Sequence, residues 1–151
     1  MSAAKLREYE YLVKTTLAPL QSARVVEAAR AGASAASLHA RAEALSALCA
    51  HPGPSPYRPM VDLGLGVSVA AEVDAAQPLL VDVGAGVHLA MAPREALLYS
   101  RMAAAEARSR HALAEKALHD VSRDLESACE ALLMLQRLQA DEGQGSRGEG
   151  Q

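Results

Sequence analysis

The sequence has no phenylalanine and no tryptophan, and its only aromatic residues are four tyrosines. Because aromatic side chains bury large apolar areas, their scarcity excludes a thick core of the usual kind. Half of the residues are nevertheless hydrophobic, at 50%, and alanine supplies much of that share. Alanine side chains let helix backbones approach closely, so the composition favours thin contacts between helices.

Other absences exclude whole classes of protein. No cluster of Lys and Arg forms the basic patch of a nucleic-acid-binding protein, and the net charge is −3, so we expect no direct nucleic-acid binding. No apolar run reaches the roughly 18 residues that a membrane span needs, and no secretory signal is expected. The two cysteines, Cys49 and Cys129, lie far apart in helical patterns and are expected to stay reduced.

The most informative feature that is present is a nine-residue unit that occurs twice. Residues 61–69 read VDLGLGVSV and residues 81–89 read VDVGAGVHL. Since strand side chains alternate between two faces, every second residue of each copy would share one apolar face. These residues are Val61, Leu63, Leu65, Val67 and Val69 in the first copy, and Val81, Val83, Ala85, Val87 and Leu89 in the second. Residues 74–78 would then form a turn that lets the two copies pair as an antiparallel hairpin.

Each copy also contains a Gly-x-Gly element, formed by Gly64 and Gly66 and by Gly84 and Gly86. Glycine inside a strand marks a bend, a bulge or the close approach of another backbone. A phosphate-binding loop is the alternative, but neither copy completes the Gly-x-Gly-x-x-Gly motif. We therefore expect bends in the strands, and neither a nucleotide nor another cofactor.

Helical patterns flank the repeats. Residues 3–50 predict a first helix, and its seven-residue step is kept by Leu6, Val13 and Leu20. Pro19 would either kink this helix or restart it from a first turn, where proline is tolerated. Residues 51–59 contain four prolines and predict a stiff connector that ends the helix.

A second helix is predicted over residues 93–140, with Pro93 in its first turn. Its pattern is a heptad with a positions Leu97, Ala104, His111, Leu118, Leu125 and Leu132, and d positions Ser100, Ala107, Ala114, Val121, Ala128 and Leu135. Residues 141–151 contain no apolar side chain and are expected to form a disordered tail.

Helices of about 45 residues would be about 65–70 Å long, which is too long for a compact domain of this size. We therefore predict an α+β fold with one domain over residues 1–140. Its two helices would form a long antiparallel coiled-coil hairpin, with β-hairpins over residues 60–91 as a small antiparallel sheet at the closed end. Because a lone hairpin is marginally stable and its edges invite pairing, other chains should complete the sheet.

Both ends of the chain would meet at the open tip, which is rich in apolar residues. They are Leu6, Tyr9, Leu12 and Val13 near the start, and Leu132, Leu133, Met134, Leu135 and Leu138 near the end. A two-stranded seam cannot bury all of them. The surplus could bind exposed apolar segments of client proteins, or it could pack against a partner helix.

Catalytic chemistry has little support in this sequence. The five histidines show no metal-ligand spacing, and Asp62 and Asp82 have no nucleophile in a recognisable motif beside them. We expect no enzyme activity, no catalytic residue and no metal site.

Residues 61–97 resemble the α-class prefoldin subunits, and within that class the UXT (ubiquitously expressed transcript) family. The resemblance is carried by Val-Asp-Leu-Gly at 61–64, Val-x-Val-Gly-x-Gly at 81–86 and Glu-Ala-Leu at 95–97, with Leu-Arg-x-Tyr-Glu at 6–10. The prefoldin subunit 5 family is the next most similar, through LVDVGAG at 80–86. At the family's aromatic strand positions this chain has Val67, Ser68, Val87 and His88.

This resemblance implies a prefoldin α-type fold and a non-catalytic subunit of a hetero-oligomeric chaperone or co-chaperone complex. Its strands would complete a barrel with a URI-like α-class subunit and β-class subunits, and its tips would bind clients. R2TP-type co-chaperones, a transcription-cofactor role and a cytoplasmic and nuclear location are also implied. Two alternatives stay open: a stand-alone coiled-coil adaptor in transcription or at the centrosome, and an ordinary prefoldin subunit that holds unfolded actin- or tubulin-like clients.

Overall fold

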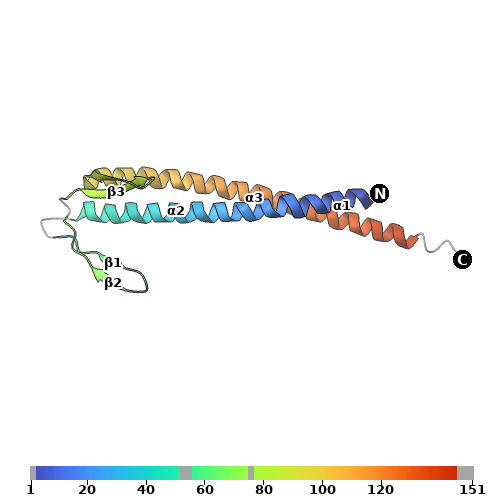
Figure 1. The fold of residues 1–151 in the computed structure, drawn as a ribbon, viewed down its shortest axis with the longest axis horizontal. Coiled ribbons are helices and arrows are strands. Elements are labelled where there is room, and N and C mark those ends of the chain that lie inside the picture. The colour runs from blue at the N-terminus through green and yellow to red at the C-terminus, as the bar shows by residue number, and fades with distance from the viewer. Residues whose placement is uncertain (1–2, 52–55, 75–76, 146–151) are drawn as a thin grey trace. The chain divides into compact units, whose positions relative to one another are not determined.

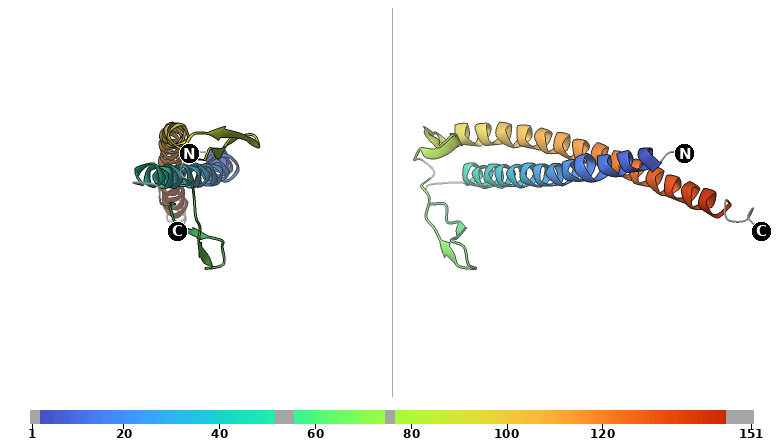
Figure 2. Two further views of the ribbon diagram at one scale, coloured as in Figure 1. Left: turned by 90° about the vertical axis from the view of Figure 1, so that its left-hand side faces the viewer. Right: turned by 45° about the vertical axis from the view of Figure 1, so that its right-hand side comes forward.

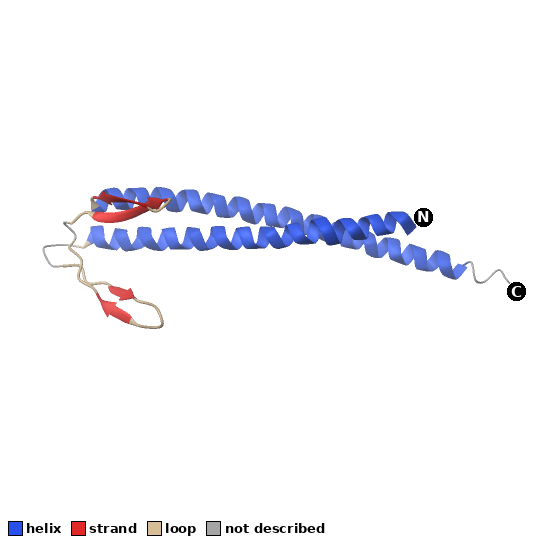
Figure 3. Cartoon of the chain, in the orientation of Figure 1, coloured by secondary structure: helices blue, strands red, loops and turns tan. Residues whose placement is uncertain are grey.

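The computed structural model describes residues 3–51, 56–74 and 77–145 (Figure 1). Its helical elements are α1 (Ala3–Leu12), the π-helix η1 (Val13–Leu17), α2 (Ala18–Ala50) and α3 (Pro93–Gly145). Its strands are β1 (Met60–Asp62), β2 (Ser68–Ala70), β3 (Leu79–Gly84) and β4 (Val87–Met91). The strands form two separate antiparallel sheets, β1–β2 and β3–β4 (Figure 3). Two long helices and two small sheets make this an α+β fold.

The chain divides into two compact units, and each long helix contributes to both. The first unit is Met1–Ala31 with Arg110–Gln151, and the second is Gly32–Ser109. Over its described residues the first unit is entirely helical, whereas the second contains both sheets.

In the first unit, residues 3–31 and 110–145 are antiparallel. The Gln21 amide donates to the Ser122 hydroxyl at 3.1 Å, and the Gln136 amide donates to the Glu10 carboxylate at 3.3 Å. The residue numbers of the bonded pairs decrease along the first segment as they increase along the second, as antiparallel helices require. Every heptad a and d position predicted on the second long helix within this unit is buried or half-buried: His111, Ala114, Leu118, Val121, Leu125, Ala128, Leu132 and Leu135.

A π-turn interrupts the regular helix just before Pro19. The Ala18 amide donates to the Val13 carbonyl, five residues back, and α2 begins at Ala18. Pro19 therefore lies in a first turn, where its missing N–H is tolerated. In an unbroken α-helix its ring would clash with the carbonyl of Thr15, and the wider turn directly before it relieves that conflict.

The extra residue in the π-turn changes which side chains face inward. Leu20, predicted on the seam with Leu6 and Val13, is 39% exposed, and Gln21 is half-buried in its place. The prediction for Leu20 was wrong because a seven-residue count assumes a constant helical period, and one added residue rotates the following helix by about 100°.

The second unit has a core of small side chains, as the composition suggested. Its buried residues are Ala35, Ala42, Leu48, Val81, Ala96, Ser100, Ala104 and Ala107. Between the helices, the Arg101 guanidinium donates to the Ser46 hydroxyl at 3.2 Å. Figure 2 shows β3–β4 beside the first turns of α3 in both views.

The start of α3 is capped and its end extends beyond the expected one. The backbone N–H of Ala92 donates to the Glu95 carboxylate at 3.2 Å, as in a capping box, and Pro93 is the first helical residue. The disorder expected over residues 141–151 does not hold for 141–145, since α3 runs to Gly145. Extending an existing helix needs no new nucleus, which favours these additional residues. Residues 146–151 lie outside the described part.

The prediction that the two copies of the repeat pair with each other was wrong. Each copy folds back on itself: Val61 pairs with Val69 in β1–β2, and Val81 pairs with Leu89 in β3–β4. The predicted turn at residues 74–78 lies between the two hairpins, and its residues 75–76 are outside the described part. Of the Pro-rich connector, residues 52–55 lie outside the described part, and Tyr57 already bridges to Val73.

Candidate functional site

The Gly-x-Gly elements are the tips of the two hairpins. In the first copy, Gly64, Leu65 and Gly66 have φ values of 89°, 55° and 76°. The Val67 amide donates to the Gly64 carbonyl at 3.0 Å, which closes a turn with positive φ at both central residues. That is the type I′ geometry, whose twist matches the flanking strands of a hairpin.

The second copy repeats this geometry with Gly84, Ala85 and Gly86 at 105°, 53° and 76°. Positive φ is unfavourable for residues with a Cβ atom, so the glycines on either side of Leu65 and Ala85 have a structural reason. Leu65 and Ala85 are turn residues, and their predicted place in a continuous strand was wrong.

Two aspartates hold the turns in the same way. The Asp62 carboxylate accepts the Gly64 N–H at 2.8 Å, and the Asp82 carboxylate accepts the Gly84 N–H at 2.8 Å. This side-chain-to-backbone bond two residues on is an Asx turn. Each carboxylate thus has a structural role in the turn of its own hairpin.

The β3–β4 hairpin is packed on the helices of its unit. Val81 is only 5% exposed, and Leu79, Val83 and Met91 are half-buried on the same face. Val87 and Leu89, also predicted as assembly residues, are exposed on β4. The β3 side of this apolar face is thus covered within the chain, whereas its β4 side, with Val87 and Leu89, is exposed.

Two helical side chains bind the backbone of β3. The Arg41 guanidinium, from α2, donates to the Asp82 carbonyl at 3.3 Å, and the Tyr99 hydroxyl, from α3, donates to the Val83 carbonyl at 3.4 Å. Arg41 also lies over the Tyr99 ring, 6.0 Å from its centroid. These contacts fix β3–β4 in place.

The β1–β2 hairpin is uncovered. Val61 occupies the repeat position of Val81 but is 41% exposed. The other predicted assembly residues of this copy are exposed as well: Leu63, Leu65, Val67 and Val69. Met60, which the sequence analysis did not single out, is also exposed. Two hairpins of nearly the same sequence therefore differ in the burial of their first strands, and β1–β2, with both strands exposed, is the stronger candidate for an interaction surface.

The predicted tip residues of the first unit fall into two sets. Leu6, Val13, Leu132 and Leu135 are buried or half-buried along the helix contact. The surplus side chains remain exposed: Tyr9, Leu12, Leu133, Met134 and Leu138. This division is the one that two-stranded packing leaves when more apolar residues are present than it can bury.

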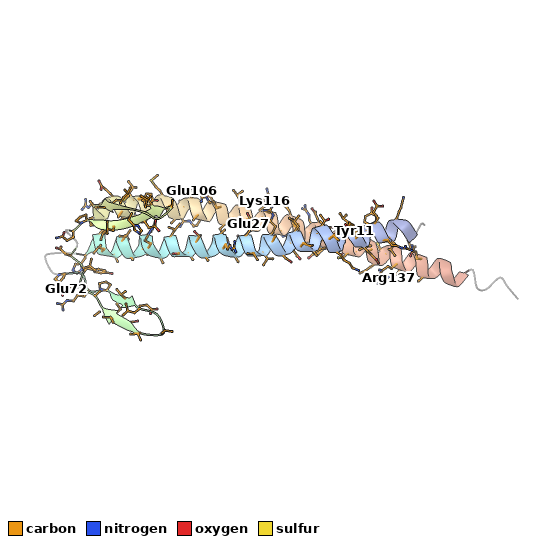
Figure 4. All side chains as sticks on the ribbon, in the orientation of Figure 1. Tyr11, Glu27, Glu72, Glu106, Lys116 and Arg137 are labelled. Atoms are coloured by element: carbon orange, nitrogen blue, oxygen red, sulfur yellow. The ribbon has the colours of Figure 1, made fainter. Side chains whose placement is uncertain are left out.

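A groove of about 500 Å³ runs along α1 and η1. It is lined by Lys5, Glu8, Tyr9, Tyr11, Leu12 and Thr16. Tyr11, labelled in Figure 4, is exposed and was missed by the sequence analysis, since a seven-residue step does not include it. Its apolar ring and polar hydroxyl suit an interaction surface.

The described residues offer no metal centre. Among residues 3–51, 56–74 and 77–145, no three His, Cys, Asp or Glu side chains gather as metal ligands. His111 contacts Glu115 one helical turn away at 3.6 Å, and Cys49 and Cys129 are free thiols. None of the described helices is both long and apolar enough to cross a membrane.

No known family model matches this chain, and no curated protein is significantly similar to it. The resemblance to α-class prefoldins thus depends on the short motifs at residues 6–10 and 61–97 alone.

Proposed function

We propose that this chain is a non-catalytic subunit of a prefoldin-like hetero-oligomeric chaperone or co-chaperone complex. Its helices form an antiparallel coiled-coil hairpin of the prefoldin α type, and its hairpins assemble with other subunits. The observation that supports this most is the uncovered β1–β2 hairpin. The β3–β4 hairpin, which has the second copy of the repeat, buries Val81 to 5% exposure, whereas Val61 in β1–β2 is 41% exposed.

The physical argument concerns the stability of the hairpin. A two-stranded hairpin in water is marginal, and a third strand or a covering layer is needed for independent stability. Here Val61, Leu63 and Val69 form an apolar surface that stays exposed among the described residues. Burial of about 25 cal/mol per Å² of such surface would stabilise both the hairpin and a complex. Strands of a URI-like α-class subunit and of β-class subunits are the proposed cover.

The exposed residues near the N-terminus and near the end of α3 are the proposed second surface. Tyr9, Leu12, Leu133, Met134 and Leu138 present separate apolar side chains instead of one enclosed pocket. Such a surface suits weak binding of unfolded or assembling clients, because it demands no particular sequence. R2TP-type co-chaperones, a cytoplasmic and nuclear location and a transcription-cofactor role belong to the same proposal.

The test is capture of the assembled complex from cells with a tagged chain, followed by native mass spectrometry. Leu63→Asp places a charge on the uncovered face, and Leu113→Asp is the matched control on α3, because the two leucines are 66% and 68% exposed. The wild type and the control should carry other subunits, and Leu63→Asp should lose them while its helical circular dichroism is kept. Recovery of only copies of this chain would refute the proposal and favour a stand-alone adaptor.

A further inference from the structure

The hydrogen bonds of the β1–β2 hairpin show which backbone groups remain outward. Tyr57 and Val73 exchange two bonds, at 3.1 and 2.8 Å, and the Ala71 amide donates to the Pro59 carbonyl at 2.9 Å. The Leu63 amide donates to Val67 at 2.9 Å. In an antiparallel pair, alternate residues bond the neighbouring strand. The odd-numbered residues from 57 to 63 therefore face the second strand.

The residues between them, Arg58, Met60 and Asp62, direct their N–H and C=O groups away from the second strand. All three are exposed. Their side chains lie on one face, where the Arg58 guanidinium contacts the Glu72 carboxylate of the same hairpin at 3.2 Å. This outer edge of the first strand, residues 58–62, is hereafter the β1 edge.

We infer that two copies of this chain pair antiparallel through their β1 edges, with Met60 opposite Met60 of the second copy. In this register Arg58 of each copy faces Asp62 of the other, so two opposite-charge pairs form by symmetry. The outward groups of all three residues meet outward groups of the second copy, as hydrogen bonding requires. The β1 edge is therefore complementary to itself.

The charges also select the register. A shift of two residues sets Arg58 or Asp62 against Met60. A shift of four sets Arg58 against Arg58 in one direction and Asp62 against Asp62 in the other, where like charges repel. Pro59 does not interfere, since its missing N–H lies on the side that faces the second strand of its own hairpin.

The remaining edges lack this complementarity. The outward residues on the other side of the hairpin are Ser68, Ala70 and Glu72, which carry charge of only one sign. On the β3 strand, the Asp82 carbonyl already accepts a bond from Arg41. The β4 strand, Val87–Met91, has no acidic residue.

Pairing of two copies would turn two marginal hairpins into one four-stranded sheet. Three or more strands with an apolar face can be stable where two are not. Val61 and Val69 of both copies would then share a face, which remains open to other subunits. The inference thus goes beyond the proposed function, which concerns chains of different sequence.

The decisive experiment uses the purified full chain alone. Met60→Pro removes an outward N–H and places a ring on the β1 edge without removing a bond inside the hairpin. Ala70→Pro is the matched control, because Ala70 pairs with Met60 and its N–H points outward on the opposite edge. In sedimentation equilibrium, the wild type and Ala70→Pro should dimerise as concentration rises, and Met60→Pro should stay monomeric. Dimerisation of Met60→Pro equal to wild type, or a monomeric wild type, would overturn the inference.

Cross-linking tests the register directly. Met60→Cys is placed in a background in which Cys49 and Cys129 are replaced by serine. Residues opposite each other in a hydrogen-bonded antiparallel pair have Cα atoms about 5.5 Å apart, within disulfide range. Oxidation should give a covalent dimer with Met60→Cys and little with Ala70→Cys, and the reverse result would contradict the inferred edge. Self-pairing without capture of other subunits would refute only the proposed function.

Discussion

Replacement of Val81 by alanine should loosen β3–β4 far more than replacement of Val61 loosens β1–β2 in the isolated chain. Both valines start a copy of the repeat, and each pairs with the last residue of its copy. Only their surroundings differ, since Val81 is buried against helices and Val61 is not. The two substitutions therefore measure the environment with the chemistry held constant.

The expected magnitudes follow from the buried area. Val→Ala removes two carbon atoms, worth about 0.8 kcal/mol each when buried, so Val81→Ala should raise the free energy of the hairpin by about 1.6 kcal/mol. An unfilled cavity would increase this to roughly 2–2.5 kcal/mol. At Val61, which already contacts water and leaves no cavity, the same change should have an effect of about 1 kcal/mol or less.

Amide hydrogen exchange of the purified chain at low concentration is the assay. Because about 1.4 kcal/mol corresponds to a factor of ten, Val81→Ala should speed exchange in β3–β4 by about tenfold or more. Val61→Ala should speed exchange in β1–β2 by about fivefold or less, with helical circular dichroism unchanged in both. Equal acceleration at the two sites would refute the claim that only one hairpin is covered.

Three further substitutions probe other parts of the structure. Pro19→Ala should let the π-turn return to α-helical bonding and rotate Gln21 out of the seam; chemical shifts and hydrogen-bond couplings of residues 13–21 would show this, and an unchanged Ala18–Val13 bond would not fit. Ser100→Ala should increase the free energy of unfolding by about 1 kcal/mol and so raise the thermal unfolding temperature, because the buried Ser100 hydroxyl has no hydrogen-bond partner among the described residues. Tyr99→Phe should speed exchange in β3 by a few-fold, since loss of one bond to the backbone is worth about 0.5–1 kcal/mol; no change would mean that this bond adds nothing.

The helices and the bends were predictable because local residue patterns determine them. Heptad a and d positions such as Ala104, Ala107 and Ala114 predicted the inward face of the second long helix, and these residues are buried. Proline ends and starts helices for steric reasons, as at Pro93. Glycine pairs marked the places where the backbone leaves the regular strand, because residues with a Cβ atom rarely adopt positive φ, but they were predicted as bends and are hairpin turns.

The pairing of the strands was not predictable from the same pattern. A period of two persists through a hairpin whose turn is centred on Leu65, so Val61 and Val69 share a face whether the chain is straight or folded back. The usual sign of a type I′ turn is Asn-Gly or Asp-Gly, and here Leu-Gly and Ala-Gly take its place. A strand and a hairpin therefore have the same signature in this sequence.

The packing of β3–β4 on the helices was also not predictable from the sequence. Arg41 and Tyr99 bind the β3 backbone from two helices, of which α2 precedes the strands in the sequence and α3 follows them. Neither residue belongs to a motif, and their bonds depend on the tertiary arrangement. Local patterns cannot distinguish a hairpin that is held in this way from one that is not.

The π-turn at Val13–Leu17 has a consequence for the aromatic side chains that precede it. The π-turn contains one residue more than an α-helical turn. The side chains before it are therefore rotated about the helix axis relative to those after it. Whether Tyr9 and Tyr11 face water is therefore decided by a segment to which neither belongs. Deletion of a single residue between 13 and 17 would turn both rings by about 100° without altering either one. The outward display of these tyrosines is thus a matter of chain length, and homologous sequences should be aligned with that offset in view.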